Sequence, residues 1–264
     1  MPLFTFLIEV SMLKLIAYSE KDVAGSNIAK LLEEKMDGLK GVRLQAYPDS
    51  LLYVTETPDD AGLLIVASRH RSESGMPTLT CHVTGNFGRA ELGGEDMSLA
   101  FAPALHLRKA LMSLQEHGMG LDYTVSLEVT HHGPTSLRCP LIFVEVGSCE
   151  KQWNDMIACE AAAKTIHDLV AEEPEETAVA IGFGGPHYAP NFSKIMEKVA
   201  FGHIMAKYSI GSLSKTMVEQ MMEKTIPKPE LAVLDWKGLK GEEKKQVVGI
   251  LEEIGVEWKK TSDY

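Results

Sequence analysis

The chain has few cysteines, and none of them is spaced for a compact metal site. Its 264 residues include four, Cys81, Cys139, Cys149 and Cys159, with no Cys-x-x-Cys pair. A structural zinc knuckle needs closely spaced thiolates, so that class of site is not expected. The favoured interpretation is four free thiols in a reducing cytoplasm.

Long apolar runs are also missing. No stretch approaches the roughly 20 apolar residues that a membrane-spanning helix needs, so no membrane association is expected. Residues 1–11 are apolar but carry Glu9 and no basic leader, which argues against a secretory signal. We therefore expect a cytoplasmic protein, in which residues 1–11 form either an extension or an extra strand.

Several compact catalytic motifs are absent as well. The sequence contains no HExxH, no G-x-S-x-G and no P-loop, and the pairs Gly93-Gly94 and Gly184-Gly185 do not make a dinucleotide fingerprint. A serine hydrolase, a kinase and a dehydrogenase therefore have little support.

Positive charge is scarce overall but uneven along the chain. The formal net charge is -11, which argues against broad, non-specific binding of nucleic acid. Residues 191–229 hold six lysines against three glutamates, a local excess of +3. This segment could present a small basic face that binds a few phosphates, or simply a solvated helix surface.

The pattern of apolar residues predicts an α/β protein. Short apolar or alternating runs predict strands, and longer amphipathic stretches predict helices. The expected strands are 13–18, 42–47, 62–67, 78–83, 125–129, 141–146, 177–182 and 231–236, and the expected helices are 25–36, 100–117, 151–172, 192–201, 219–224 and 244–254. We expect a three-layer α/β/α architecture with a mixed sheet, in one domain over residues 1–264 that can be divided into two lobes.

The stretch from Val125 to Ser148 concentrates chemically active residues. His131 and His132 lie on a loop between two expected strands, Glu128 precedes the loop, and Glu145 lies in an apolar strand. A carboxylate there costs free energy unless it is paired, hydrogen-bonded or bound to a metal. Adjacent histidines point to opposite sides of an extended chain, so we expect only one of them to bind a metal. The alternative is a polar turn with surface histidines.

Further histidines lie next to glycine, proline or strand ends. His70 follows an expected buried strand, beside Arg69 and Ser72, and His187 follows Gly184-Gly185. Ligands in open α/β sheets collect where strands end. Imidazoles and carboxylates at such positions suit zinc, and a hydrolytic zinc site needs about three protein ligands and an open position for water.

Several segments together resemble the archaeal and plant type of D-aminoacyl-tRNA deacylase. They are YSEKDVAGSNIA (18–29), SRHRSESG (68–75), LTCHVTGN (79–86), EVTHHGPT (128–135), EVGS (145–148) followed by Trp153, GFGGPHYAP (182–190) and GHIMAKY (202–208). The resemblance implies a fold similar to phosphorylases and peptidyl-tRNA hydrolases. It also implies a zinc-dependent hydrolase, here expected to be a monomer, that acts on tRNA carrying a D-amino acid at its 3' end.

The resemblance also implies roles for individual residues. It gives Glu128, His132 and Arg69 as catalytic residues. It gives His82, His131, Glu145, His187 and His203 as candidate ligands of Zn2+. The substrate-binding residues that it implies are His70, Ser72, Asn86, Thr135, Gly184, Gly185, Tyr188 and Lys207.

Two other functions remain open from the sequence. A zinc-dependent aminopeptidase or carboxypeptidase would use similar ligands to cleave amides. A non-catalytic module that binds the tRNA end or a nucleotide would use the histidines structurally.

Overall fold

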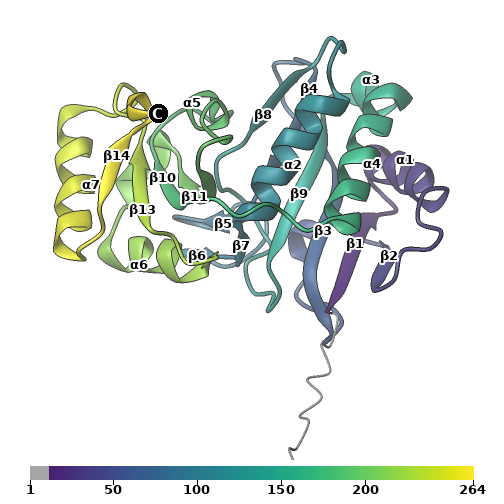
Figure 1. Ribbon diagram of the computed structural model, residues 1–264, viewed down its shortest axis with the longest axis horizontal. Helices are drawn as coiled ribbons and strands as arrows, with labels where there is room; N and C mark the ends of the chain where they lie inside the picture. Colours follow the sequence, from purple (N-terminus) through teal and green to yellow (C-terminus); the bar gives the residue numbers. More distant parts are fainter. Residues whose placement is uncertain (1–11) are drawn as a thin grey trace, which may run out of the picture.

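The computed structural model describes residues 12–264, and the expectation for residues 1–11 lies outside them. Two sheets lie side by side in the molecule (Figure 1). The α/β class with a mixed sheet is confirmed, and most of the strands are divided between a six-stranded and a four-stranded sheet. No helix within residues 12–264 is long and apolar enough to cross a membrane.

The first sheet has six strands in the order β2-β1-β3-β9-β4-β8. Their bounds are β1 Leu13–Ser19, β2 Val42–Tyr47, β3 Ala61–Arg71, β4 Thr78–His82, β8 Thr124–Leu127 and β9 Leu141–Ser148. Neighbouring strands are parallel except β4 and β9, which makes the sheet mixed. The buried runs in β3 and β9 are typical of central strands covered on both faces.

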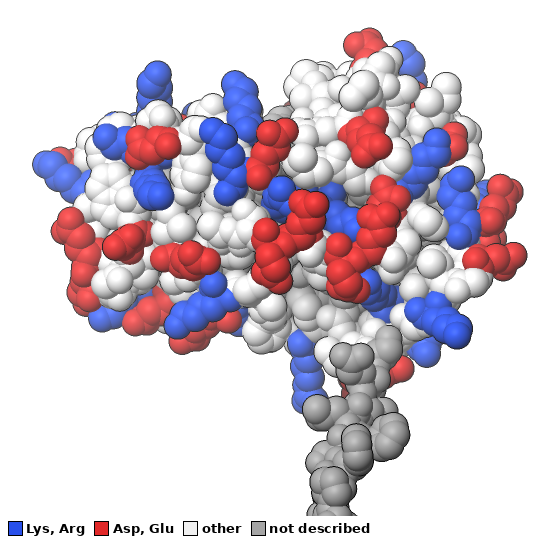
Figure 2. Space-filling model, in the orientation of Figure 1, with Lys and Arg blue, Asp and Glu red and all other residues white. Residues whose placement is uncertain are grey.

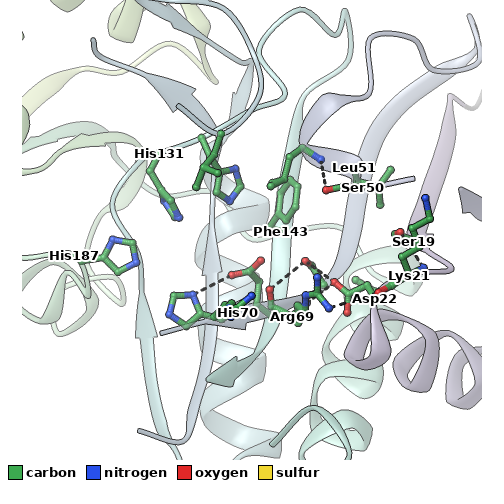
Figure 3. Close-up of a pocket in the computed structure, with 17 residues that line it drawn as sticks. Ser19, Lys21, Asp22, Ser50, Leu51, Arg69, His70, His131, Phe143 and His187 are labelled. Atoms are coloured by element: carbon green, nitrogen blue, oxygen red, sulfur yellow. Dashed lines mark hydrogen bonds and ion pairs between the residues drawn. The ribbon is translucent and has the colours of Figure 1, made fainter. Parts of the chain in front are cut away.

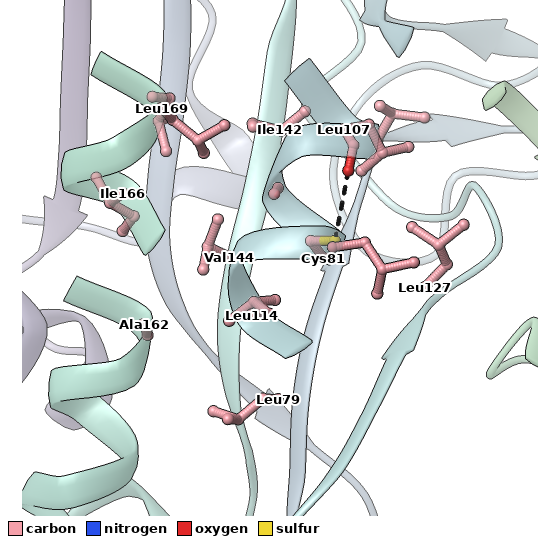
Figure 4. Close-up of a cluster of buried hydrophobic side chains, with 14 of the residues drawn as sticks. Leu79, Cys81, Leu107, Leu114, Leu127, Ile142, Val144, Ala162, Ile166 and Leu169 are labelled. Atoms are coloured by element: carbon pink, nitrogen blue, oxygen red, sulfur yellow. Dashed lines mark hydrogen bonds between the residues drawn. The ribbon is translucent and has the colours of Figure 1, made fainter. Parts of the chain in front are cut away.

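Three helices cover one face of this sheet: α1 Val23–Glu33, α2 Ala104–His117 and α4 Met156–Ala171. Side chains at alternate positions of β9, such as Ile142 and Val144, share a fully buried cluster with Leu107 and Ile166 of the helices (Figure 4). Because successive strand side chains point to opposite faces, the intervening residues of β9 lie on the other side of the sheet.

The opposite face is covered differently. Leu64, Val66, Leu141 and Phe143 pack there against the short 3-10 helix η1 (Leu51–Tyr53) and irregular segments that contain Leu137 and Cys139. This cover does not extend over the whole face, and the remaining part borders the cavity described below.

The second sheet has four parallel strands in the order β11-β10-β13-β14, with bounds β10 Val179–Phe183, β11 Ala200–Met205, β13 Leu231–Leu234 and β14 Trp258–Lys260. Helices α6 (Lys215–Lys224) and α7 (Gly241–Glu253) pack on it through a second apolar cluster. The first turn of α2 contacts its other face, where Ala104 and Leu105 pack against Val179 and Ala200.

The smaller elements are short. Two-stranded pairs join β5 (Gly85–Asn86) with β6 (Ser98–Leu99) and β7 (Ala102–Pro103) with β12 (Thr225–Ile226). The remaining helical turns are α3 Glu150–Trp153, α5 Pro190–Ser193, η2 Lys207–Ser212 and η3 Thr261–Asp263. All four cysteines are free, as expected.

Two expected helices differ from the structure. The expected helix 151–172 is interrupted, because the Asp155 carboxylate accepts hydrogen bonds from the amides of Ile157 and Ala158 and so begins α4 as a separate helix. The expected helix 192–201 is wrong over most of its length. Only Pro190–Ser193 is helical, and Ala200 already belongs to β11, paired with Val179. Pairing within the sheet overrides the helical spacing of the apolar residues there.

Candidate active site

The site begins on the face of the first sheet that the helices do not cover. Register pairs Glu145 of β9 with Ser68 of β3 and Thr80 of β4, and it pairs Phe143 with His82. Because paired residues of adjacent strands lie on the same face, polar side chains from three central strands meet beside Phe143. The His82 ring stacks on Phe143 with a centroid separation of 5.2 Å.

Gly147 makes room for His70 on this face. The two residues are paired between β9 and β3. A Cβ at position 147 would lie 2.6 Å from Thr78 Oγ1 and 2.8 Å from His70 Cβ, closer than such atoms approach. The absence of a side chain at this one position therefore allows the imidazole of His70 to lie against the sheet.

The loop after β8 carries His131 and His132 over the sheet. Backbone bridges join Glu128 to Tyr188 and His131 to Thr84. His132 has φ of +43°, so the chain is not extended at this residue. The expectation that the two histidines diverge is wrong, because this backbone turn brings their ring centroids to 4.3 Å.

Three imidazoles form the first cluster. One ring nitrogen of each of His82, His131 and His132 lies within 4.8 Å of the other two. In all three, Nδ1 donates to a backbone carbonyl, that of Val83 at 3.2 Å, Val129 at 2.8 Å and Gly133 at 2.6 Å, respectively. This arrangement leaves the Nε2 lone pairs available, and it is the arrangement that fixes the tautomer of metal-binding histidines.

Glu128 is the centre of a second cluster. Its side chain is fully buried, and its oxygens lie 3.0 Å from His70 Nδ1, 2.9 Å from His187 Nε2 and 3.4 Å from His131 Nε2. Neither carboxylate oxygen has a partner with hydrogen-bond geometry among residues 12–264, and the same is true of His82 Nε2. Buried polar atoms are normally satisfied, so this group of atoms has the character of a site for a cation or water.

Titration of the site is strongly perturbed. Burial, followed by the neighbouring His132 and His82, holds the pKa of His131 well below its usual range, and burial with His82 lowers the pKa of His132 to about 3. Both rings are therefore neutral at pH 7, the form that binds a metal. Burial opposes protonation of His82 too, but the adjacent Glu145 raises its pKa overall.

The carboxylates shift in the opposite direction from what burial alone would give. Burial raises the pKa of Glu128, but His187 and His70 more than offset it and hold that pKa well below its usual range. Burial likewise lowers the pKa of His70, yet Glu128 and Glu145 raise it to about 11. The site therefore holds ionised carboxylates beside the charged imidazole of His70, a charge separation that structural cores seldom contain.

A cavity of about 580 Å³ opens over these clusters. Figure 3 shows His70, His131 and His187 at one end, Ser19, Lys21 and Asp22 at the other, and Phe143 between them. Leu51, Leu52 and Leu92 add apolar wall. A volume of this size suits a small organic group with a few polar anchors.

Most of the expected catalytic and metal-binding residues come together here. His70, His131, His132, Glu145, His187 and Arg69 line the cavity, with Glu128 and His82 buried beside it. His203 does not join them. It is fully buried, its Nε2 donates to the Ala100 carbonyl at 2.9 Å, and its Nδ1 lies 3.3 Å from Thr130 Oγ1. Both ring nitrogens of His203 are thus engaged elsewhere.

The expected substrate-binding residues are more dispersed. Tyr188 places its hydroxyl 2.9 Å from His70 Nε2, so it contacts the cluster without lining the cavity. Asn86 donates to the Gly93 carbonyl and Thr135 accepts from the Glu95 amide, which makes both part of the loop packing.

Four expected substrate-binding residues do not line the cavity: Ser72, Gly184, Gly185 and Lys207. Ser72 bonds to Ser74 in a turn beyond β3. Gly184 and Gly185 adopt positive φ, and the Gly185 carbonyl accepts from the amide of the exposed Lys207.

Sequence reasoning missed the far end of the cavity. Asp22 caps α1 by accepting from the Gly25 amide at 2.9 Å, and it also accepts from the Arg69 amide at 2.9 Å, which ties the ends of β1 and β3 together. Arg69 in turn lies over the Trp153 ring, 5.1 Å from its centroid. The signal was present, because Ser19 to Asp22 follow a parallel strand at the same sheet edge as Arg69.

This chain is similar to one known protein family and to a solved structure. The family model described as D-aminoacyl-tRNA deacylase matches residues 57–259. A crystal structure described as a conserved protein of unknown function is similar over 96% of both chains, with a TM-score of 0.88 and 31% identity.

Curated relatives carry the same family name. A D-aminoacyl-tRNA deacylase from Thermococcus kodakarensis is 41% identical over 74% of this chain and 72% of its own length, and one from Ignicoccus hospitalis is 36% identical over 92% and 97%. The relative from Methanocorpusculum labreanum is 40% identical over 92% of this chain, which spans only 57% of that protein. The chain belongs to the D-aminoacyl-tRNA deacylase family.

Proposed function

We propose that this chain hydrolyses the ester bond of D-aminoacyl-tRNA, releasing the free D-amino acid and tRNA. The observation that carries the proposal is the cluster of five histidines and two glutamates at one end of a cavity, in a member of this family. Ester hydrolysis requires an activated water and a group that accepts or donates its proton, and this cluster offers residues for both roles.

Zn2+ fits the residues that are present. His82, His131 and His132 would hold it, because each keeps Nδ1 on a backbone carbonyl and leaves Nε2 free. Bound zinc supplies positive charge that lowers the pKa of water and polarises a carbonyl. The unpartnered, fully buried Nε2 of His82 favours a ligand at this position. In this assignment His132 is a ligand, and the earlier candidates Glu145 and His187 take other roles.

Glu128 and His187 are placed to handle the proton. The Glu128 carboxylate lies 2.9 Å from Nε2 of His187, whose ring is partly exposed to the cavity. His187 can take a proton from a water in the cavity, and the ionised Glu128 stabilises the imidazolium that forms. Glu145 and Glu128 together hold His70 charged, and its Nε2 contacts the Tyr188 hydroxyl. These contacts fix the positions of the Glu128 and Glu145 carboxylates beside the zinc-binding histidines.

The remainder of the cavity suits the end of a charged tRNA. Leu51, Leu52, Leu92 and Phe143 offer apolar surface for the adenine or the amino-acid side chain, while Arg69 and Lys21 bring positive charge for the terminal phosphate. We expect chirality to be selected by this shape, which accepts the side-chain direction of a D residue. We also expect a monomer that acts in the cytoplasm.

The decisive experiment compares matched D- and L-tyrosyl-tRNA with and without a chelator. We expect hydrolysis of the D ester only, loss of activity with the chelator, and recovery when Zn2+ is restored. A His132→Ala variant should contain less bound zinc than the wild type, as measured by elemental analysis. Cleavage of peptide amides instead would favour a peptidase, and tight binding of acylated tRNA without release of the amino acid would favour a binding module.

A further inference from the structure

A second cavity, of about 350 Å³, lies at the carboxyl edge of the second sheet. Its wall is formed by the last residue of β14 and by residues that follow β10, β13 and β14: Asn191, Lys194, Ile195, Asp235, Trp236, Lys237, Lys260, Thr261 and Ser262. β10 pairs with β11 on one side and β13 on the other, so the chain order reverses between β10 and β13. Crevices at such switch points are where parallel sheets bind ligands.

The cavity is basic in an acidic protein. Three lysines and one aspartate line it, giving +2, whereas the whole chain carries -11. Lys194 and Lys237 are exposed, and none of the three lysines forms an ion pair with a carboxylate of residues 12–264. Figure 2 shows Lys and Arg side chains gathered over the upper part of this half of the molecule, near β14 and α5.

A buried carboxylate and a pair of stacked tryptophans form the floor of the cavity. Asp235 is 3% exposed, and its carboxylate accepts a hydrogen bond from the side-chain Nδ2 of Asn191 at 3.1 Å. Trp236 stacks on Trp258 with a centroid separation of 5.5 Å, and the ammonium groups of Lys244 and Lys260 each lie 4.9 Å from the Trp236 centroid. These contacts hold Lys260 over a rigid aromatic pair and keep its charge at the cavity.

This cavity is close to the reaction site. His187 lines the first cavity and Asn191 lines the second, and they are four residues apart in one segment. Their Cα atoms therefore lie no more than about 15 Å apart, since each trans peptide spans about 3.8 Å. A polynucleotide with its 3' end in the first cavity can place phosphates a few nucleotides upstream at the lysines.

We propose that Lys194, Lys237 and Lys260 form a docking site for the phosphodiester backbone of tRNA upstream of its 3' end. The proposal rests on the proposed function for its choice of partner. Positive charge concentrated at one place lets an acidic protein bind one stretch of backbone at a fixed register without attracting nucleic acid generally. The site thereby contributes affinity for tRNA, and the reaction cavity selects the ester.

The test replaces all three lysines by glutamine and measures binding of uncharged tRNA by fluorescence anisotropy at several salt concentrations. We expect the dissociation constant to rise about tenfold or more, and the slope of log affinity against log salt to fall by about 3, one for each lost contact. The control replaces Lys30, Lys35 and Lys40, which removes the same charge from the region around α1. Its binding should match the wild type.

Hydrolysis gives a second measurement. With D-tyrosyl-tRNA the triple variant should raise KM with little change in kcat, and with D-tyrosyl-adenosine, which lacks the upstream backbone, it should equal the wild type. Equal tRNA binding in the two triple variants would overturn the proposal. The same binding measurement with ATP tests a site for free nucleotides. If the triple variant loses ATP binding while its tRNA binding is unchanged, the cavity is such a site and the proposal is overturned. Binding of uncharged tRNA does not depend on catalysis. The binding assay therefore tests the docking site even if the chain does not hydrolyse D-aminoacyl-tRNA.

Discussion

On one face of the six-stranded sheet, Ile142 and Val144 of β9 are buried among the side chains of α2 and α4, whereas Phe143 and Glu145, their neighbours in sequence, face the cavity. The first face is apolar and close-packed. The second contains buried carboxylates, imidazoles and hydroxyls, several without hydrogen-bond partners among residues 12–264. Burial of such groups costs free energy. We call the side of the sheet that carries Ile142 and Val144 the helix face, and the side that carries Phe143 and Glu145 the cavity face. Stability therefore depends mainly on the helix face, and reactivity on the cavity face.

The largest expected effect comes from removing an imidazole on the cavity face. His131→Ala should lower hydrolysis of D-tyrosyl-tRNA by about 10²-fold or more and reduce bound zinc, because it deletes one of the three free Nε2 atoms. Its ring is 23% exposed, so the fold should survive. Rate measurements and elemental analysis check both effects.

His203 provides a matched control for that variant. It is also a buried histidine, but both its nitrogens contact groups outside the cavity. His203→Asn should cost about 1–3 kcal/mol of stability through the unsatisfied Ala100 carbonyl, while kcat and zinc content stay near wild type. Equal loss of activity in the two variants would contradict the distinction between them.

The helix face should respond in stability and not in chemistry. Ile142→Ala removes fully buried methyl groups from the cluster between the sheet and the helices, and should lower the free energy of unfolding by about 2–5 kcal/mol. The neighbouring Phe143→Leu should cost less and should alter KM, since Phe143 lines the cavity. Denaturant unfolding and steady-state kinetics on the pair separate the two faces. A large change in kcat for Ile142→Ala would break the comparison.

Much of this contrast was predictable from the sequence. The position of histidines and arginine just after expected strands indicated which segments meet, because parallel strands end at one sheet edge. Glu145 was identifiable since a carboxylate in an apolar strand needs a partner, and Glu128 was identifiable from its position just before the histidine loop. Local pattern thus identified most of the residues around the cavity.

The remaining features depended on contacts distant in sequence. His132 turns toward His131 through one left-handed residue, and Tyr188 reaches His70 across 118 positions. His203 lies next to Gly202 and so met the criterion of a histidine beside glycine, yet its strand β11 was not expected and belongs to the second sheet. Neither a backbone angle at a non-glycine residue nor the division of strands between sheets is encoded in periodicity.

A smaller change tests how closely the cavity face is fitted. Gly147→Ala would place a methyl group 2.8 Å from His70 Cβ, so the imidazole must shift. We expect a loss of about tenfold in kcat/KM, because displaced catalytic groups lose alignment. Gly249→Ala in α7 is the control: its Cβ would meet no atom within 4 Å, and it should stabilise the protein by about 0.5–1 kcal/mol. Unchanged kinetics for Gly147→Ala would show that His70 need not be held where it is.

The smallest expected effect concerns a histidine on α2, away from the cavity. Burial, and then the charge of Lys14, lowers the pKa of His106 to about 4. Between that value and the unfolded value of about 6.5, the unfolded chain binds more protons, so stability is present above pH 6.5 and declines as pH falls toward 4. Since the ring is not fully buried, the contribution is on the order of 1 kcal/mol. His106→Leu should flatten the pH dependence of chemical unfolding over this range, whereas an unchanged slope would assign the acid sensitivity to the histidines and carboxylates of the cavity face instead.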